Sequence, residues 1–364
     1  MEFSDRPLSV STPGRICLFG EHQDYLQLPV IAAGISLRIT IEGTKRVDRK
    51  VNIDLPDIRR RESFEITDPL SYTKKRDYFR SAINVLGRRH FHFQYGFDCA
   101  VHSDIPINAG TASSSALVVG WVNFLSRMCD QPRDLSPEEI ARMAHEAEVS
   151  EFGEPGGIMD HYSTAKGGVI WLESHPEPRM VGIEADLKSF VLGNSHHPKD
   201  TTMILANVKD RILEVAGIVG ERHPEFSLHT ASREDLERFC ADLDPRQFDL
   251  LAGTVRNREI SCEARELITH APLDHKRIGE LLNEHQTVLR DVLKISTPKI
   301  DRMIEVALNA GAYGAKINGS GGGGCMFAYA PENPEAVAEA VRSVSEATVV
   351  HVDCGTREEK EINV

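Results

Sequence analysis

Four side chains that can form hydrogen bonds or exchange protons cluster near the start of the chain. The β-branched residues before them predict a strand that delivers Arg15, and Gly20 then turns the chain and exposes Glu21, His22 and Asp24 together. Two carboxylates and an imidazole can bond several hydroxyl groups at once, which suits recognition of a polyhydroxylated ligand. A polar turn with solvated charges explains the same residue types equally well.

A stretch of small residues between positions 106 and 117 has the composition of a phosphate-binding loop. Small side chains let the backbone approach a ligand, and the helix predicted over residues 111–128 points free N–H groups at an anion. The serine hydroxyls could contact phosphate oxygens or a metal ion. A serine-rich helix cap is the alternative, because serine is a favoured N-cap residue. The candidate loop consists of Asn108, Ala109, Gly110, Thr111, Ala112, Ser113, Ser114 and Ser115.

A glycine run occupies residues 319–324 between two apolar segments that predict strands. Five glycines in six positions carry a large conformational entropy cost, so we expect close backbone approach to a ligand rather than a linker. The run contains the spacing of a dinucleotide-binding fingerprint, but that fingerprint must open a helix, and a strand is predicted after it. The sequence also lacks the glycine-rich lysine motif of P-loop enzymes.

Two further carboxylates lie where the chain breaks out of a predicted helix. Glu148 comes near the end of that helix, and Asp160 follows a turn made by Gly156 and Gly157. A carboxylate in such an otherwise uncharged stretch could act as a general base. Capping of the next helix is the alternative role for Asp160.

Composition excludes several classes of protein. The formal net charge of −13 over 364 residues disfavours nucleic acid as a partner. No run of about 20 apolar residues predicts a membrane span, and residues 1–6 lack the features of a secretory signal. The seven cysteines are scattered without a CxxC pair, which is typical of a reducing compartment. We therefore expect a cytoplasmic protein without a membrane partner.

The order of predicted elements indicates an α+β fold. Strands are expected at residues 9–16, 30–41, 97–103, 170–172, 190–192, 315–318, 325–330 and 348–352. Helices are expected at residues 111–128, 137–152, 199–217, 233–241, 274–293, 298–309 and 334–347. Ser136 and Glu139 have the spacing of a capping box. A boundary between two lobes is expected near residues 180–195.

The three motifs, in this order, resemble those of the GHMP kinases, which include galactokinase, homoserine kinase and mevalonate kinase. The likeness covers residues 9–352, and its most specific part, residues 14–25, looks like the galactokinase signature. The resemblance implies a ribosomal-protein-S5-like N-terminal lobe over residues 1–185 and a ferredoxin-like C-terminal lobe over residues 186–364. The active site would lie between the lobes.

The resemblance also implies a role for each candidate residue. The loop of residues 108–115 matches the part of the family that binds ATP, and Ser115 and Glu148 match its Mg²⁺ ligands. Asp160 and Arg15 match its catalytic pair. The implied activity is ATP-dependent phosphorylation of a small-molecule sugar or polyol, as in a galactokinase-like sugar 1-kinase. The residues that match substrate contacts are Glu21, His22, Asp24 and Gly157.

The sequence departs from galactokinases at several positions. Leu26 and Leu28 stand where galactokinases have Asn and Gly, and residues 193–211 look more like the corresponding mevalonate kinase segment. His196, His197 and Lys199 in that segment could approach a substrate carboxylate or phosphate, or form an exposed polar turn before a helix. Phosphorylation of a mevalonate-like alcohol is therefore the second interpretation. A catalytically silent ligand sensor and a decarboxylase that shares the fold are further alternatives.

Overall fold

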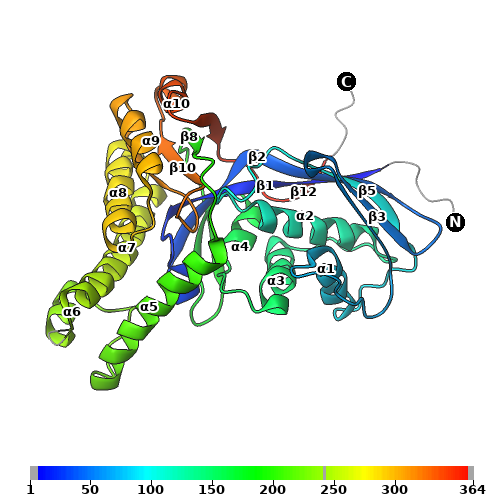
Figure 1. Cartoon of the computed structure of the whole chain (residues 1–364), viewed down its shortest axis with the longest axis horizontal. Coiled ribbons are helices and arrows are strands. Elements are labelled where there is room, and N and C mark those ends of the chain that lie inside the picture. Colours follow the sequence, from blue (N-terminus) through cyan, green and yellow to red (C-terminus); the bar gives the residue numbers. More distant parts are fainter. Residues whose placement is uncertain (1–6, 241–242, 360–364) are drawn as a thin grey trace.

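The computed structural model describes residues 7–240 and 243–359, which form two lobes side by side (Figure 1). Two predictions concern residues outside the described ones. They are the lack of a secretory signal in residues 1–6 and the last residue, Ala241, of the helix predicted over residues 233–241. Within the described part of the chain, no helix combines the length and apolar character needed to cross a membrane.

The first lobe is built on an eight-stranded sheet with the order β12-β1-β2-β5-β3-β4, with β6 paired to β2 and β7 paired to β6. The long strand β2 lies at its centre, where it pairs with β1, β5 and β6, and it is rich in β-branched residues that pack well on a pleated surface. The bounds are β1 Leu8–Phe19, β2 Val30–Lys45, β3 Lys50–Leu55, β4 Arg60–Glu65, β5 Phe97–Ser103, β6 Val169–Glu173, β7 Arg179–Ile183 and β12 Arg357–Glu358.

Helices cover one face of this sheet (Figure 1). Trp121 is the centre of the core between them, with its ring centroid 5.2 Å from that of Phe79 and 5.5 Å from that of Phe97. The predicted capping box is confirmed, because Ser136 Oγ accepts from the Glu139 amide at 3.2 Å and Glu139 accepts from the Ser136 amide at 2.8 Å. The helices are α1 Tyr78–Gly87, α2 Ser113–Met128, α3 Pro137–Glu148 and α4 Met159–Lys166.

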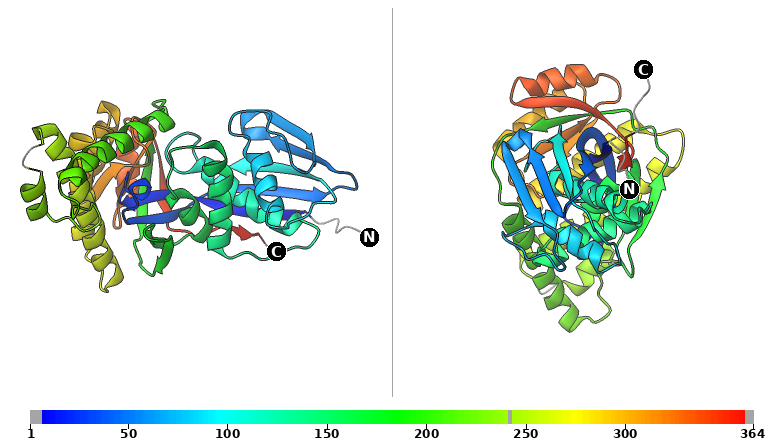
Figure 2. Two further views of the ribbon diagram at one scale, coloured as in Figure 1. Left: turned by 90° about the horizontal axis from the view of Figure 1, so that it is seen from below. Right: turned by 90° about the vertical axis from the view of Figure 1, so that its right-hand side faces the viewer.

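The second lobe has a four-stranded antiparallel sheet with the order β11-β8-β10-β9. In Figure 2 its yellow-green helices gather at one end of the molecule and the blue strands of the first lobe at the other. The bounds are β8 Ser189–Asn194, β9 Gly314–Ile317, β10 Cys325–Tyr329, β11 Glu346–His351, α5 Thr201–Arg222, α6 Arg233–Phe239, α7 Pro245–Thr269, α8 His275–Thr287, α9 Pro298–Asn309 and α10 Pro334–Arg342.

Three helices differ from the sequence prediction, and one of them, α1 at Tyr78–Gly87, has no counterpart in it. Helix α7 was not predicted at all, because it buries polar residues such as Thr254 and Asn257 together with Leu251 and therefore shows no single apolar stripe. The helix predicted over residues 274–293 is divided, with α8 followed by a π-helical turn at Val288–Val292.

The two lobes share apolar packing and a returning chain. One hydrophobic cluster contains Phe19 and Ile31 from the first sheet and Phe190 and Phe327 from the second. After β11 the chain crosses back, and β12 pairs with β1. The division of the chain at residue 185 stays a prediction.

Candidate functional site

The predicted motifs meet in a cavity of about 330 Å³ between the lobes. It lies where the end of β1, the loop before α2, the end of α3 and the start of α4 come together. Of the predicted residues, the following line it: Arg15, Glu21, His22, Asp24, Asn108, Gly110, Ala112, Ser113, Ser114, Ser115, Glu148, Gly157 and Asp160.

The two remaining loop residues face protein rather than the cavity. The carbonyl of Ala109 accepts from the Cys325 amide at 2.6 Å, and the carbonyl of Thr111 accepts from the Arg15 amide at 3.1 Å. These bonds fix the candidate phosphate loop to β10 on one side and to β1 on the other.

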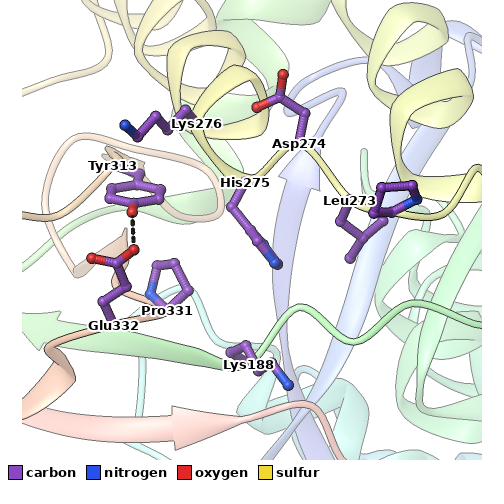
Figure 3. A pocket seen from close by; sticks show the side chains of 9 residues that line it. Lys188, Leu273, Asp274, His275, Lys276, Tyr313, Pro331 and Glu332 are labelled. Atoms are coloured by element: carbon purple, nitrogen blue, oxygen red, sulfur yellow. Dashed lines mark hydrogen bonds between the residues drawn. The ribbon is translucent and has the colours of Figure 1, made fainter.

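A second cavity of about 550 Å³ lies on the outer side of the second lobe (Figure 3). The side chains of His275 and Lys188 point toward it, and Tyr313 bonds Glu332 at its edge. Its described lining residues belong to none of the predicted motifs, so the chemistry expected from the sequence is confined to the cavity between the lobes.

A buried guanidinium and a carboxylate form the centre of the site. Arg15 Nε and Nη2 lie 2.8 and 2.7 Å from Asp160 Oδ1, and Arg15 Nη1 donates to the carbonyl of Gly110. Burial opposes the charge of Arg15, but the negative charges of Asp160 and Glu21 outweigh it and raise the pKa of Arg15. Asp160 is the second residue of α4, whose N-cap is Ile158, so a capping role for Asp160 is wrong.

Asp24 lies against the same helix. Its Oδ2 accepts from the Met159 amide at 3.2 Å, and it touches Gly157, where a Cβ would lie only 1.9 Å from that oxygen. Burial and the neighbouring charge of Asp160 raise the pKa of Asp24 to about 6. Two carboxylates thus face one small volume, with Asp24 less acidic than a free aspartate.

His22 is held as a neutral ring with defined bonds. Its Nε2 lies 3.0 Å from the carbonyl of Ser320 and must donate there, so its Nδ1, 2.6 Å from the Tyr25 hydroxyl, accepts. Burial lowers the pKa of His22 to about 4, in agreement with that state. The backbone of His22 has φ 63°, in the left-handed region, so these two bonds hold a conformation that few non-glycine residues adopt.

Glu21 forms a buried ion pair across the lobes. Its Oε2 lies 2.6 Å from Lys316 Nζ, and its Oε1 accepts from the Gly319 amide at 2.7 Å. Lys316 also donates to the carbonyls of Cys17 and Ile317. Both oxygens of Glu21 are therefore engaged within the protein, unlike the carboxylate of Asp24.

Glu148 lies beside the serines at the start of α2. His161 Nε2 is 2.8 Å from its Oε2, and Ser114 and Ser115 are within hydrogen-bonding reach. Burial opposes ionisation of Glu148, but these bonds, with His161 the largest contributor, lower its pKa. An ionised carboxylate beside a serine hydroxyl offers the hard oxygen ligands that Mg²⁺ prefers. Magnesium usually takes its other ligands from phosphates and water.

Comparison with known proteins identifies the family. Residues 77–168 match the GHMP kinases N terminal domain, residues 264–347 match GHMP kinases C terminal, and residues 1–45 match the galactokinase galactose-binding signature. The mevalonate kinase of Pyrococcus furiosus is 30% identical over 351 residues, which cover 91% of this chain and 92% of that protein. The chain belongs to the GHMP kinase family.

Other relatives of this GHMP kinase include galactokinases. That of Actinobacillus succinogenes is 28% identical over 354 residues, covering 93% of this chain and 88% of that one. The structure of Lactococcus lactis galactokinase complexed with galactose superposes with a TM-score of 0.86 at 22% identity, over 98% of this chain and 96% of that chain. The structure of the Methanococcus jannaschii mevalonate kinase superposes with a TM-score of 0.74 at 18% identity, over 96% of this chain and 99% of that chain. The expected fold, with N- and C-terminal domains, is confirmed.

The glycine run of this GHMP kinase packs against the backbone of the candidate phosphate loop. A Cβ on Gly319 would lie 2.7 Å from the carbonyl oxygen of Gly110, and one on Gly324 would lie 2.5 Å from that of Ala109. Asn318 Nδ2 also donates to the Gly110 carbonyl at 2.8 Å. The sequence predicted that the backbone of this run comes close to a ligand. In the structure it comes close to the candidate phosphate loop and holds that loop in place.

Lys199 also lines the cavity, although it is not among the residues matched to the family's site. The sequence left it either near a substrate carboxylate or phosphate or in an exposed turn. Its ammonium is buried and has no hydrogen-bond partner among the described residues. Burial, and then the charge of Arg15, lower the pKa of Lys199 to about 8. Its neighbour His196 instead pairs with Glu346 at 2.9 Å on the surface. Sequence alone could not separate these two residues.

We expect Lys316→Met to destabilise the fold strongly, because it leaves the Glu21 carboxylate buried without its cation. Breaking a buried pair in this way costs about 3–5 kcal/mol of unfolding free energy. Urea unfolding would measure the loss, and adding Glu21→Gln should restore part of it. Arg61→Met is the control, since it breaks the exposed pair with Asp54 and should change little. Equal losses of unfolding free energy in Lys316→Met and Arg61→Met would contradict this expectation.

We expect Gly157→Ala to lower turnover by roughly tenfold to a hundredfold, because the new methyl group must displace Asp24 from its place beside Asp160. Gly156→Ala is a matched control, because the nearest atom to its Cβ would be 3.6 Å away. ADP production with the preferred acceptor measures both variants. If Gly156→Ala were the more damaging of the two, the assignment of this contact would be wrong.

The raised pKa of Asp24 predicts how stability varies with pH. Because its folded pKa of about 6 exceeds the ordinary 3.8, the folded state binds more protons between these values. The unfolding free energy therefore falls as pH rises through this window. Above about pH 6, the full destabilisation from ionising the buried Asp24 carboxylate is present. Asp24→Asn should stabilise the protein by about 1–3 kcal/mol at pH 8 and hardly at all at pH 4. Thermal unfolding at both pH values measures this, and equal shifts would refute it.

Proposed function

We propose that this GHMP kinase phosphorylates a hydroxyl of a sugar, as a galactokinase-like sugar 1-kinase, with ATP as donor and Mg²⁺ as cofactor. The observation that carries the proposal is the position of Asp24. It belongs to the segment that matches the galactose-binding signature, and it lies close enough to Asp160 for the charge of that residue to raise its pKa. An acceptor bound by Asp24 would therefore present a hydroxyl to Asp160.

Asp24 and the Gly157 backbone are assigned to acceptor binding. A carboxylate can accept from two neighbouring hydroxyls, and the absence of a side chain on Gly157 lets the Asp24 carboxylate lie against the start of α4. His22 and Glu21 are assigned to the same pocket, where their bonds to Ser320, Lys316 and Gly319 fix their orientation.

Asp160 and Arg15 are assigned to the transfer step. Both contacts from Arg15 go to Asp160 Oδ1, which leaves Oδ2 to take the proton of the acceptor hydroxyl. The hydroxyl oxygen then forms its bond to the terminal phosphorus as the bond from that phosphorus to ADP breaks. Because Arg15 also reaches Gly110 in the loop, its charge is placed to stabilise the phosphoryl group between donor and acceptor.

The loop of residues 108–115 is assigned to the nucleotide phosphates, which would lie at the N-terminus of α2. Glu148 and Ser115 would hold Mg²⁺, and the ion when bound neutralises charge on the β- and γ-phosphates. His161 keeps Glu148 oriented and ionised for that purpose.

A mevalonate-like alcohol is the second candidate acceptor. It is favoured by the identity of 30% with the Pyrococcus furiosus mevalonate kinase, which is level with the 28% shared with a galactokinase. A silent sensor is less favoured, because Arg15 and Asp160 retain a bonded arrangement that a sensor would not require.

The test is ADP production with ATP and Mg²⁺ against galactose and its epimers, pentoses, uronic acids, N-acetylhexosamines, heptose phosphates and mevalonate. We expect turnover with one sugar. Asp160→Asn should bind nucleotide as the wild type does but lose turnover by roughly 10²–10⁴-fold, as for removal of a general base. Turnover with mevalonate alone would favour the second candidate, and near-normal turnover of Asp160→Asn would remove Asp160 from the mechanism. ATP binding without any turnover would favour the sensor.

A further inference from the structure

Lys199 holds an uncompensated positive charge inside the site. It lies between β8 and α5, one residue before the N-cap Asp200. Its Nζ is buried with no hydrogen-bond partner among the described residues, and it lines the cavity between the lobes. Lysine is almost never buried unpaired, because the desolvated ammonium loses its bonds to water. Something outside the protein is therefore needed to complete this position.

The nearby carboxylates are already engaged by other groups. Asp160 is bonded to Arg15 and Glu21 to Lys316, and these pairs come from β1, α4 and β9 around the cavity. The groups within electrostatic reach of Lys199 include Arg15, Cys325, Glu21, Asp160 and the neutral ring of His22. The positive charge of Arg15 repels the ammonium, so the position favours a further negative charge supplied by a ligand.

The location of the ammonium indicates which anion it meets. A Cβ on Gly110 would lie 2.9 Å from Lys199 Nζ, and one on Gly324 would lie 3.0 Å from it. The ammonium therefore sits against the candidate phosphate loop at Gly110, the residue whose carbonyl also accepts from Arg15.

We propose that Lys199 binds the terminal phosphoryl group of the nucleotide, opposite Arg15, and is a further catalytic residue of this kinase. This inference rests on the proposed function, since it requires ATP in the loop. With the two cations on either side of Gly110, the phosphoryl group would be held between them while it passes to the acceptor. ADP lacks that group, so Lys199 should contribute to binding of a triphosphate and little to binding of ADP.

The experiment compares the dissociation constants of ADP and of the non-hydrolysable ATP analogue with an imido bridge between the β- and γ-phosphates. Calorimetric titrations with Mg²⁺ would use the wild type, Lys199→Met, Lys199→Arg and the control Lys276→Met. Lys276 is exposed and distant from the site, and its replacement changes the net charge equally. In Lys199→Met, the ratio of the analogue's dissociation constant to that of ADP should rise by on the order of tenfold or more, as for loss of a charge-assisted bond.

Lys199→Arg should keep the ratio close to the wild-type value, because its guanidinium retains the charge, and Lys276→Met should leave it unchanged. Thermal unfolding of each variant verifies that it is folded. An equal loss of affinity for both nucleotides, or no loss for either, would overturn this inference and leave the proposed function standing. Failure of the wild type to bind either nucleotide would overturn the proposed function and this inference with it.

Discussion

The buried ion pair between Glu21 and Lys316 is the interaction on which the site depends. Both side chains are almost fully buried, and the pair joins the turn after β1 to the end of β9 across almost 300 residues of sequence. The second oxygen of Glu21 bonds the first amide of the glycine run, and that run in turn seats the candidate phosphate loop at Gly110. A charge pair of this kind adds little net stability compared with apolar packing, but its bonds fix the turn after β1 against the end of β9.

This constraint explains why a carboxylate matched to substrate contact is engaged within the protein. A buried Glu21 must be paired, and Lys316 supplies the partner. Asp24 forms no ion pair with a cation of the described residues, and burial and the charge of Asp160 outweigh the attraction of Arg15 and raise its pKa. The two acidic residues of one short motif therefore differ in role: one fixes the relative position of the lobes, and the other remains available to a ligand.

Much of the fold and the site could be predicted from the sequence because each motif stands next to a strand or a helix end. The position of Arg15 follows from the strand that contains it, and that of the loop of residues 108–115 follows from the helix that begins within it. The pairing of Glu21 with Lys316 could not be predicted, since the two residues meet only through the contact of the lobes. Helix α7 was missed for a related reason, because polar side chains such as Asn257, which bonds the carbonyl of Glu21, fill its buried face.

The electrostatic arrangement of the cavity is that of a site prepared for a highly charged ligand. Among the described residues, Lys199 lacks a protein partner and Asp24 is only in part compensated. Lys199 lies against Gly110, whose carbonyl bonds Arg15, and Asp24 lies against the Met159 amide, next in sequence to Asp160. Such uncompensated groups cost stability in the free protein, and folded proteins retain them where binding requires them. The cation against Gly110 and the carboxylate against Gly157 therefore divide the cavity into a part suited to an anion and a part suited to hydroxyl groups, with Arg15 and Asp160 where the two parts meet.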